Sequence, residues 1–278
     1  MKTILVPTDF STSADNAIDY AAEIAKAANA KLVLFHVYNI PVVPAEAPIA
    51  MPTEEIEKEA MNELQKIKQR LDMKYGEQLS VRCECEFGFP VEEINSYAKE
   101  CNADLIVMGM EGTGILTEKL IGSITTTLIK KANCPVLAID GHVQFTSIKK
   151  IAFASDYNQT NNKLALAPLK ELAGLFQSHI YILNVVPEGE EIPSMDKAAE
   201  GIKLEHSLEG TDHSFHFMSN KDVVEGINQF VEEQKIDMVA MIPHTHSFFQ
   251  NLFQEPMSKR MAFHTKAPLL TLHEHDNG

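Results

Sequence analysis

Two segments of this 278-residue chain carry residue types that suit binding of a sugar and a phosphate group. Asp9 directly follows the first apolar run, where its carboxylate could accept hydrogen bonds from ribose hydroxyls. Gly109 and Gly112 follow a later apolar run, and glycines there allow tight turns and close approach of the backbone to a ligand. Gly122 and Ser123 begin a predicted helix, whose free N–H groups and dipole favour a phosphate.

Each of these positions also has a purely structural interpretation. The glycines could serve only to shape a tight loop, and Ser123 is a favourable N-cap for the helix that follows. The sequence contains no Walker A motif, no nucleophile elbow and no paired Cys/His signature. The pattern therefore indicates a binding site and names no general base.

The elements that must position these residues alternate between strand and helix patterns. Uninterrupted apolar runs, which predict strands covered on both faces of a parallel sheet, occupy residues 4–6, 32–35, 105–108 and 136–139. Residues 81–87 alternate apolar and charged side chains, which predicts a half-exposed edge strand. Apolar stripes with helical spacing lie within residues 14–25, 60–71 and 91–101. This order predicts a doubly wound α/β sheet, in which ligands bind beyond the carboxyl ends of strands.

The chain contains this unit twice. Two pairs of similar segments lie 133 positions apart (237 − 104 and 266 − 133), namely residues 104–109 with 237–242 and residues 133–139 with 266–272. Residues 8–10 resemble residues 155–157 at an offset of 147, from 155 − 8. The second copy has therefore lost 14 residues (147 − 133) in its middle. The period has the size of a domain, which indicates a tandem duplication.

We therefore expect two tandem doubly wound domains, residues 1–141 and residues 148–274, each with a five-stranded parallel sheet and helices on both faces. The last predicted strand of each copy, residues 136–139 and 269–272, carries no charged residue and would be an aggregation risk at a bare edge. Pairing of these two strands across a pseudo-twofold axis would remove both edges. Cover by a helix or loop is the alternative.

Composition restricts the class of partner. Lys and Arg number 24 against 39 Asp and Glu, which gives a formal net charge of −15. Such a chain repels nucleic acid and anionic membranes. No apolar run reaches the roughly 18 residues that a membrane span needs. The four cysteines lack any CxxC pair, which is typical of reduced thiols. We expect a cytoplasmic protein that binds neither nucleic acid nor a membrane.

The glycine spacing carries a resemblance to a known family. Gly109-x2-Gly112-x9-Gly122-Ser123 is similar to the ATP-binding motif of the universal stress protein family. Further segments that resemble this family, in order, are residues 4–11, His36-Val37, Gly88-Phe89-Pro90 with Ile94, and residues 133–136. The resemblance covers residues 1–140 and, more weakly, the second copy. The whole chain thus resembles a tandem universal stress protein with the adenine nucleotide alpha hydrolase-like fold.

This resemblance implies that the first domain of a stress-response regulator binds ATP or a related adenine nucleotide, with Mg²⁺ beside the triphosphate. The implied ligand-binding residues are Pro7, Val37 and Met108 at the adenine, Asp9 at the ribose, and Gly109, Gly112, Gly122, Ser123, Ile124 and Thr125 at the phosphates. A homodimer and an unidentified protein partner are left open. A slow ATPase or nucleotidyl-transferring enzyme of the same fold, and a nucleotide-free scaffold, are the alternatives.

The sequence departs from the family pattern around the first two glycines. Family members that bind ATP carry basic residues or histidine at places that here hold Met110, Glu111 and Thr113. A carboxylate near a triphosphate is repulsive unless a cation intervenes. Lys119 could supply a positive charge to the same loop.

The second domain lacks the motif at the constant offset of 133. The four key positions there hold Ile242, Thr245, Glu255 and Pro256, while Asp156 retains the ribose carboxylate. Their side chains block the close backbone approach, so we expect no ATP binding there. His244 and His246, with His213 or His216, could alternatively hold a metal, although unliganded histidines are the simpler interpretation. The apolar stretch that includes Phe248, Phe249, Leu252 and Phe253 is expected to fill the vacated pocket.

Overall fold

The computed structural model describes residues 1–39, 53–111, 121–156, 164–186, 195–243 and 267–273. The first half contains β1 (Thr3–Pro7), α1 (Thr12–Ala28), β2 (Lys31–Tyr38), α2 (Thr53–Tyr75), the 3₁₀ turn η1 (Gly76–Gln78), β3 (Ser80–Phe87), α3 (Pro90–Glu100), β4 (Leu105–Gly109), α4 (Ser123–Lys131) and β5 (Val136–Ile139). The second contains β6 (Lys150–Ala154), α5 (Ala167–Phe176), β7 (His179–Val186), α6 (Met195–Ser207), β8 (His213–Ser219), α7 (Val223–Gln234), β9 (Met238–Met241) and β10 (Leu269–Thr271).

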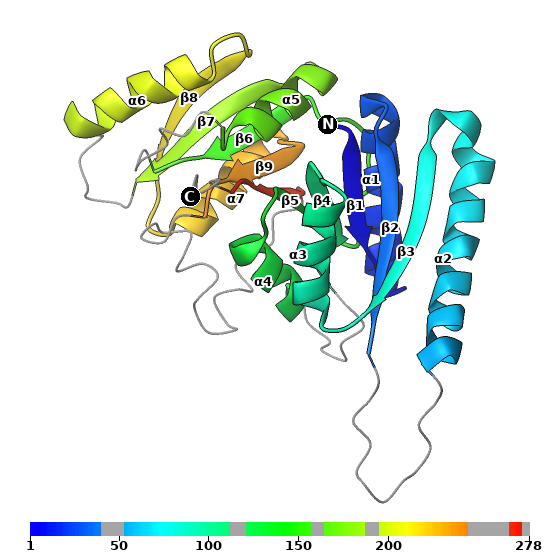
Figure 1. Ribbon diagram of the computed structural model, residues 1–278. Helices are drawn as coiled ribbons and strands as arrows, with labels where there is room; N and C mark the ends of the chain where they lie inside the picture. Colours follow the sequence, from blue (N-terminus) through cyan, green and yellow to red (C-terminus); the bar gives the residue numbers. More distant parts are fainter. Residues whose placement is uncertain (40–52, 112–120, 157–163, 187–194, 244–266, 274–278) are drawn as a thin grey trace, which may run out of the picture.

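All ten strands join one sheet in the order β3-β2-β1-β4-β5-β10-β9-β6-β7-β8 (Figure 1). Each half is parallel and has the same doubly wound order, which confirms the predicted fold class. The charged strand β3 lies at one edge, as its alternating pattern predicts.

The two halves meet where β5 and β10 pair in antiparallel register, with Leu270 opposite Leu137. The Thr271 hydroxyl adds a 3.2 Å hydrogen bond to the carbonyl oxygen of Val136. The predicted pairing of the two last strands is therefore confirmed. A pseudo-twofold axis between the two halves requires these two strands to pair antiparallel, as they do.

Each face of the sheet packs against its own set of helices. One core cluster joins the sheet to α1, α2, α5 and α6 through residues such as Ile18, Leu64 and Leu169. The other joins it to α3, α4 and α7 through residues such as Leu128 and Ile227. Side chains alternate between the two clusters along each strand, because successive strand residues point to opposite faces. The apolar runs read as uninterrupted for this reason.

Equivalent carboxylates accept hydrogen bonds from the backbone at the start of the first strand in each half. Asp104 Oδ2 accepts a 2.9 Å hydrogen bond from the backbone N–H of Thr3, and Asp237 Oδ2 accepts one of the same length from Lys150. The carboxylates lie 133 positions apart (237 − 104) and the donors 147 (150 − 3). The two sequence offsets are thus reproduced in one repeated contact.

The segment between the halves is fastened to both of them. Asn16 Nδ2 donates to the carbonyl oxygens of Asp140 and Val143, at 3.1 Å and 2.8 Å. The Phe145 ring contacts Tyr20 of the first half and Phe176 of the second, at centroid distances of 5.0 Å and 5.8 Å. Within the described residues, no helix is long and apolar enough to cross a membrane.

Candidate functional site

Four of the predicted ligand-binding residues lie at the carboxyl edge of three neighbouring strands, β2, β1 and β4. Pro7 ends β1, where it pairs with Phe35 of β2. Val37 lies two residues further along β2, and Met108 and Gly109 end β4. The structure therefore brings the predicted adenine-contacting residues to one edge. Gly112 and Lys119 lie outside the described residues.

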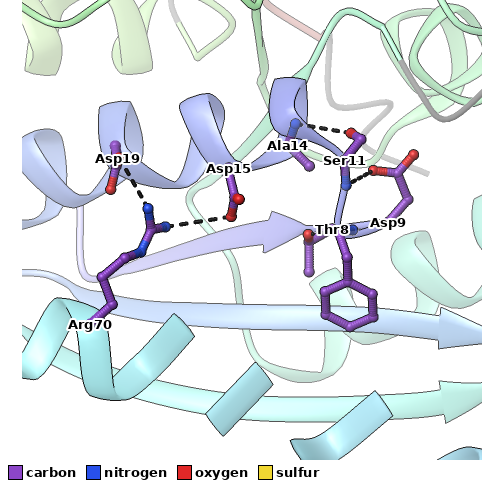
Figure 2. A network of polar contacts seen from close by, with 8 residues as sticks. Thr8, Asp9, Ser11, Ala14, Asp15, Asp19 and Arg70 are labelled. Atoms are coloured by element: carbon purple, nitrogen blue, oxygen red, sulfur yellow. Dashed lines mark hydrogen bonds and ion pairs between the residues drawn. The ribbon is translucent and has the colours of Figure 1, made fainter. Parts of the chain in front are cut away.

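The turn after β1 holds Asp9 at this edge (Figure 2). Asp9 Oδ1 accepts a 3.0 Å hydrogen bond from the N–H of Ser11. Ser11 is the N-cap of α1, and its hydroxyl accepts a 3.2 Å hydrogen bond from the N–H of Ala14. Phe10 adopts a φ of +62°, and its N–H donates to Thr8 Oγ1 at 3.0 Å. This local network keeps the Asp9 carboxylate exposed to solvent beside the strand ends.

The side chain of His36, on β2, contacts the turn after β1 at Thr8 and Phe10. His36 Nδ1 lies 2.7 Å from the carbonyl oxygen of Thr8, and its ring stacks on Phe10 with centroids 4.4 Å apart. Because a carbonyl oxygen only accepts, Nδ1 must carry the proton of this ring. The second half has an equivalent hydrogen bond from β7 to the turn after β6. There Asn184 Nδ2 donates to the carbonyl oxygen of Ser155 at 2.7 Å. The turn geometry is thus retained in both halves.

The helix α4 starts one residue earlier than a Ser123 cap would place it. Gly122 is the N-cap, without a side-chain hydrogen bond, and Ser123 is the first helical residue with an exposed side chain. The interpretation of Ser123 as N-cap is therefore wrong. Gly122 N–H donates to the Met110 carbonyl oxygen at 2.7 Å, which holds the start of α4 against the end of β4.

The first turn of α4 presents backbone donors toward the strand edge. The N–H groups of Ser123, Ile124 and Thr125 have no acceptor among the described residues, and no side chain caps them. The positive end of the helix dipole lies at the same place. This is the arrangement that favours binding of an anion.

The Thr125 hydroxyl has a structural role. It is buried and donates a 2.9 Å hydrogen bond to the carbonyl oxygen of Gly109. A phosphate contact from Thr125 would therefore use its backbone N–H, because the hydroxyl is already engaged. The bond ties α4 to the end of β4, so it also positions the donors of that first turn.

Gly109 is glycine because α1 passes directly beside it. A Cβ at this position would lie 2.6 Å from Ser13 Oγ and 3.0 Å from the backbone C and O of Ser13. Ser13 is buried, and its hydroxyl has no hydrogen-bond partner among the described residues. The sequence analysis missed Ser13, since nothing local shows that its helix touches β4. Close packing against α1 is therefore sufficient to explain the glycine at position 109.

The equivalent position in the second half is filled. Ile242 is 5% exposed and belongs to the core cluster on the α1 and α5 face of the sheet. Its side chain therefore packs into the core on that face. Of the other degenerate positions, Thr245, Glu255 and Pro256 lie outside the described residues, as do the phenylalanines at 248, 249 and 253.

The candidate edge carries negative charge. Asp9 and Glu111 supply carboxylates, and no Lys or Arg occurs within residues 7–13, 36–38, 108–111 and 121–125, all of which the structure describes. A triphosphate here would be held by backbone donors against this charge, and a bound cation would offset it.

A separate hollow of about 730 Å³ lies beside α2, on the α1 and α2 side of the sheet. Phe10, His36, Ile56 and Ala60 contribute to its wall, together with polar residues of α2. None of the predicted ligand-binding residues that the structure describes lines it. We therefore do not assign it to the nucleotide.

Of the histidines considered as metal ligands, the structure describes His213 and His216. His213 and His216 are three residues apart on β8, so they point to opposite faces of the sheet. No group of three or more potential ligands occurs among the described residues. His244 and His246 lie outside them.

Comparison with known proteins decides the family. The model of the universal stress protein family matches residues 1–140. The chain belongs to the universal stress protein family. Universal stress protein MJ0531 of Methanocaldococcus jannaschii is 36% identical to it over 143 residues, which cover 50% of this chain and 81% of that protein.

A solved structure of the family extends the likeness in fold to the whole chain. A universal stress protein from Archaeoglobus fulgidus covers 99% of this chain and 97% of its own, with a TM-score of 0.73 and 18% identity. At that identity the likeness shows the fold alone, and it does so for both halves. A universal stress protein in complex with cAMP is 26% identical over 50% of this chain and 96% of its own, with a TM-score of 0.39.

Proposed function

We propose that this universal stress protein is a non-enzymatic regulator whose first half binds ATP or a related adenine nucleotide at the carboxyl edge of β2, β1 and β4. Two domains with boundaries at residues 1–141 and 148–274 underlie the proposal. The nucleotide would stabilise one arrangement of the segment between Gly109 and Gly122, and so shift the population that a protein partner recognises. The partner and the stress signal are not specified by the chain.

The observation that carries the proposal is the uncapped start of α4. Three consecutive N–H groups at residues 123–125 lack acceptors among the described residues, and a 2.7 Å hydrogen bond from Gly122 to Met110 holds them beside β4. The strand ends with Pro7, Val37 and Met108 lie at the same edge. Backbone donors suit phosphates, and the neighbouring apolar side chains suit a purine ring.

The roles follow from these positions. Val37, Met108 and Pro7 would contact the adenine, and the exposed Asp9 carboxylate would accept bonds from the ribose. Gly109, Gly112 and the first turn of α4 at Gly122, Ser123, Ile124 and Thr125 would surround the phosphates. Mg²⁺ bound by the phosphates would offset the charge of Asp9 and Glu111.

The second half would act structurally and would not bind ATP in this manner. It keeps the turn at Ser155 and Asp156. However, Ile242, which follows β9, occupies the position equivalent to Gly109 at the end of β4. Its strand β10 completes the sheet of the first half through β5.

Calorimetric titration with Mg-ATP tests the site. We expect Gly122→Glu to weaken binding at least about tenfold, because it places a carboxylate at the phosphate-facing helix end. The matched control is Gly174→Glu, which adds the same charge at an exposed position of α5, where nothing lies within 4 Å of the new Cβ. Equal affinity of wild type and Gly122→Glu would contradict the assignment.

A nucleotide-free scaffold is the second candidate, and the observation that favours it is Glu111 at the start of the phosphate-facing loop. Mass spectrometry of small molecules released from freshly purified protein separates the two. An adenine nucleotide in stoichiometric amount eliminates the scaffold. An empty protein that also fails to bind Mg-ATP supports it.

A further inference from the structure

Four polar side chains form a continuous hydrogen-bonded array at the far edge of the second half. Asp212 Oδ2 lies 2.9 Å from His179 Nδ1. His179 Nε2 lies 2.7 Å from Ser214 Oγ, which in turn lies 2.8 Å from His216 Nε2. A carboxylate, an imidazole and a hydroxyl joined in this order have the geometry of a Ser-His-Asp triad.

The sheet places these groups on one face. His179 begins β7, while Ser214 and His216 alternate on the neighbouring edge strand β8. Two aromatic rings border these groups. The ring centroid of Tyr181 on β7 lies 5.1 Å from that of His216, and the ring centroid of Phe230 on α7 lies 5.3 Å from it. His179, Ser214 and His216 are half-buried and Asp212 is exposed, and all four lie far from the candidate nucleotide edge of the first half.

Counting donors and acceptors determines where the protons lie when both rings are neutral. The Asp212 carboxylate only accepts, so His179 carries its proton on Nδ1 and Nε2 is an acceptor. Ser214 must then donate its hydroxyl proton to His179 Nε2. The hydroxyl oxygen accepts in turn, so His216 Nε2 is an N–H donor. Burial, followed by the electrostatic effect of His179, lowers the pKa of His216 and so favours its neutral form.

We propose that Ser214 is an activated nucleophile, with His179 as its base and Asp212 as a positioning residue, and that it accepts the acyl group of small activated carboxylic esters. This site is independent of the proposed nucleotide binding. The half-buried ring of Tyr181, which pairs with Ser214 across the two strands, offers an apolar surface for a short acyl or aryl group rather than a charged one.

The reaction balances with the groups present. Ser214 Oγ forms a bond to the acyl carbon while its proton passes to His179 Nε2, and Asp212 stabilises the imidazolium. The ester C–O bond then breaks, and the leaving alcohol or phenol takes that proton. The His216 N–H, already directed at Ser214 Oγ, holds that oxygen in place as it attacks the carbonyl carbon. Water can release the acyl group as a carboxylic acid by the reverse proton transfers.

The test uses the full chain and p-nitrophenyl acetate as the probe. We expect a burst of p-nitrophenolate and an acetyl group that peptide mapping places on Ser214. Loss of the base in His179→Gln should slow acetylation of Ser214 by about 100-fold. Asp212→Asn should slow it at least about tenfold, and Asp212→Glu should restore part of the rate, which a purely structural role would not produce.

Matched controls lie on the same strand. Ser219→Ala removes an exposed hydroxyl of β8, and His213→Gln removes the imidazole that points to the other face. Both should keep the wild-type burst. Acetyl groups on lysines with none on Ser214, or a full burst in Ser214→Ala, would overturn the proposal. Asp212 is 79% exposed, so Asp212→Asn remains informative even if Ser214→Ala fails to fold.

Discussion

Ser13 lies so close to Gly109 that a Cβ on the glycine would come within 2.6 Å of the serine hydroxyl oxygen. The helix α1 and the end of β4 are thus fitted to each other before any ligand is considered. The segment that leads from β4 to α4 starts from a point that core packing holds in place.

Gly109→Ala should therefore destabilise the protein by about 1–3 kcal/mol through overpacking. Removing the serine side chain in Gly109→Ala/Ser13→Gly should recover only part of the loss, because the backbone C and O of Ser13 still lie 3.0 Å from the new Cβ. Urea unfolding measures both. The control Gly174→Ala, in open space on α5, should be neutral or stabilising by up to about 1 kcal/mol.

Thr125→Val should cost about 1–2 kcal/mol, since it leaves the Gly109 carbonyl oxygen without its 2.9 Å donor inside a buried contact. It should also weaken Mg-ATP binding, because the same bond positions the first turn of α4. Thr127→Val is the matched control in that helix, as its hydroxyl only donates back to the Ser123 carbonyl oxygen. Equal stability of the two variants would show that the Gly109 bond does not hold α4.

Glu111→Gln should raise the affinity for ATP without magnesium by about fivefold, because it removes a carboxylate near the phosphates worth about 1 kcal/mol in water. The gain should shrink with Mg²⁺ present, since the cation already offsets this charge. Titrations with and without EDTA measure the difference. Glu209→Gln, an exposed change in the second half, should leave both affinities unaltered.

The contact between His213 and Glu205 should stabilise the fold more at acidic than at alkaline pH. Burial lowers the pKa of His213, but the hydrogen bonds to Glu205 and to the Thr211 carbonyl oxygen outweigh it and raise the pKa above its ordinary 6.5. A raised pKa in the folded state adds stability that is complete below the unfolded pKa and is lost as pH rises through the folded value.

The free energy of unfolding of His213→Gln should thus fall below that of wild type by up to about 1 kcal/mol at pH 5, with the difference shrinking toward pH 8. Denaturant unfolding at the two pH values measures it. Glu205→Gln should abolish most of the pH-dependent difference. A difference that grows with pH would contradict the assigned direction.

The strand and helix elements, their order and the duplication could all be predicted from the sequence. Apolar runs and 3.6-residue stripes are local, and a constant offset between residues 104 and 237 is visible without coordinates. The absence of charge in the two last strands even predicted their pairing, because such strands cannot remain bare edges. The apolar runs also placed Pro7, Val37, Met108 and Gly109 near the ends of their strands, where the structure has them.

Contacts between distant segments were decided only by the tertiary structure. Ser13 meets Gly109, and His179 meets Ser214, because the sheet order places their elements side by side, which periodicity cannot reveal. Whether Gly122 or Ser123 caps α4 depends on the hydrogen bond to Met110, which local sequence preferences do not encode. The sequence by itself determined the elements and pointed to the strand edge at which we propose that a nucleotide binds; packing across the sheet decided which side chains hold that edge and which form the array on β8.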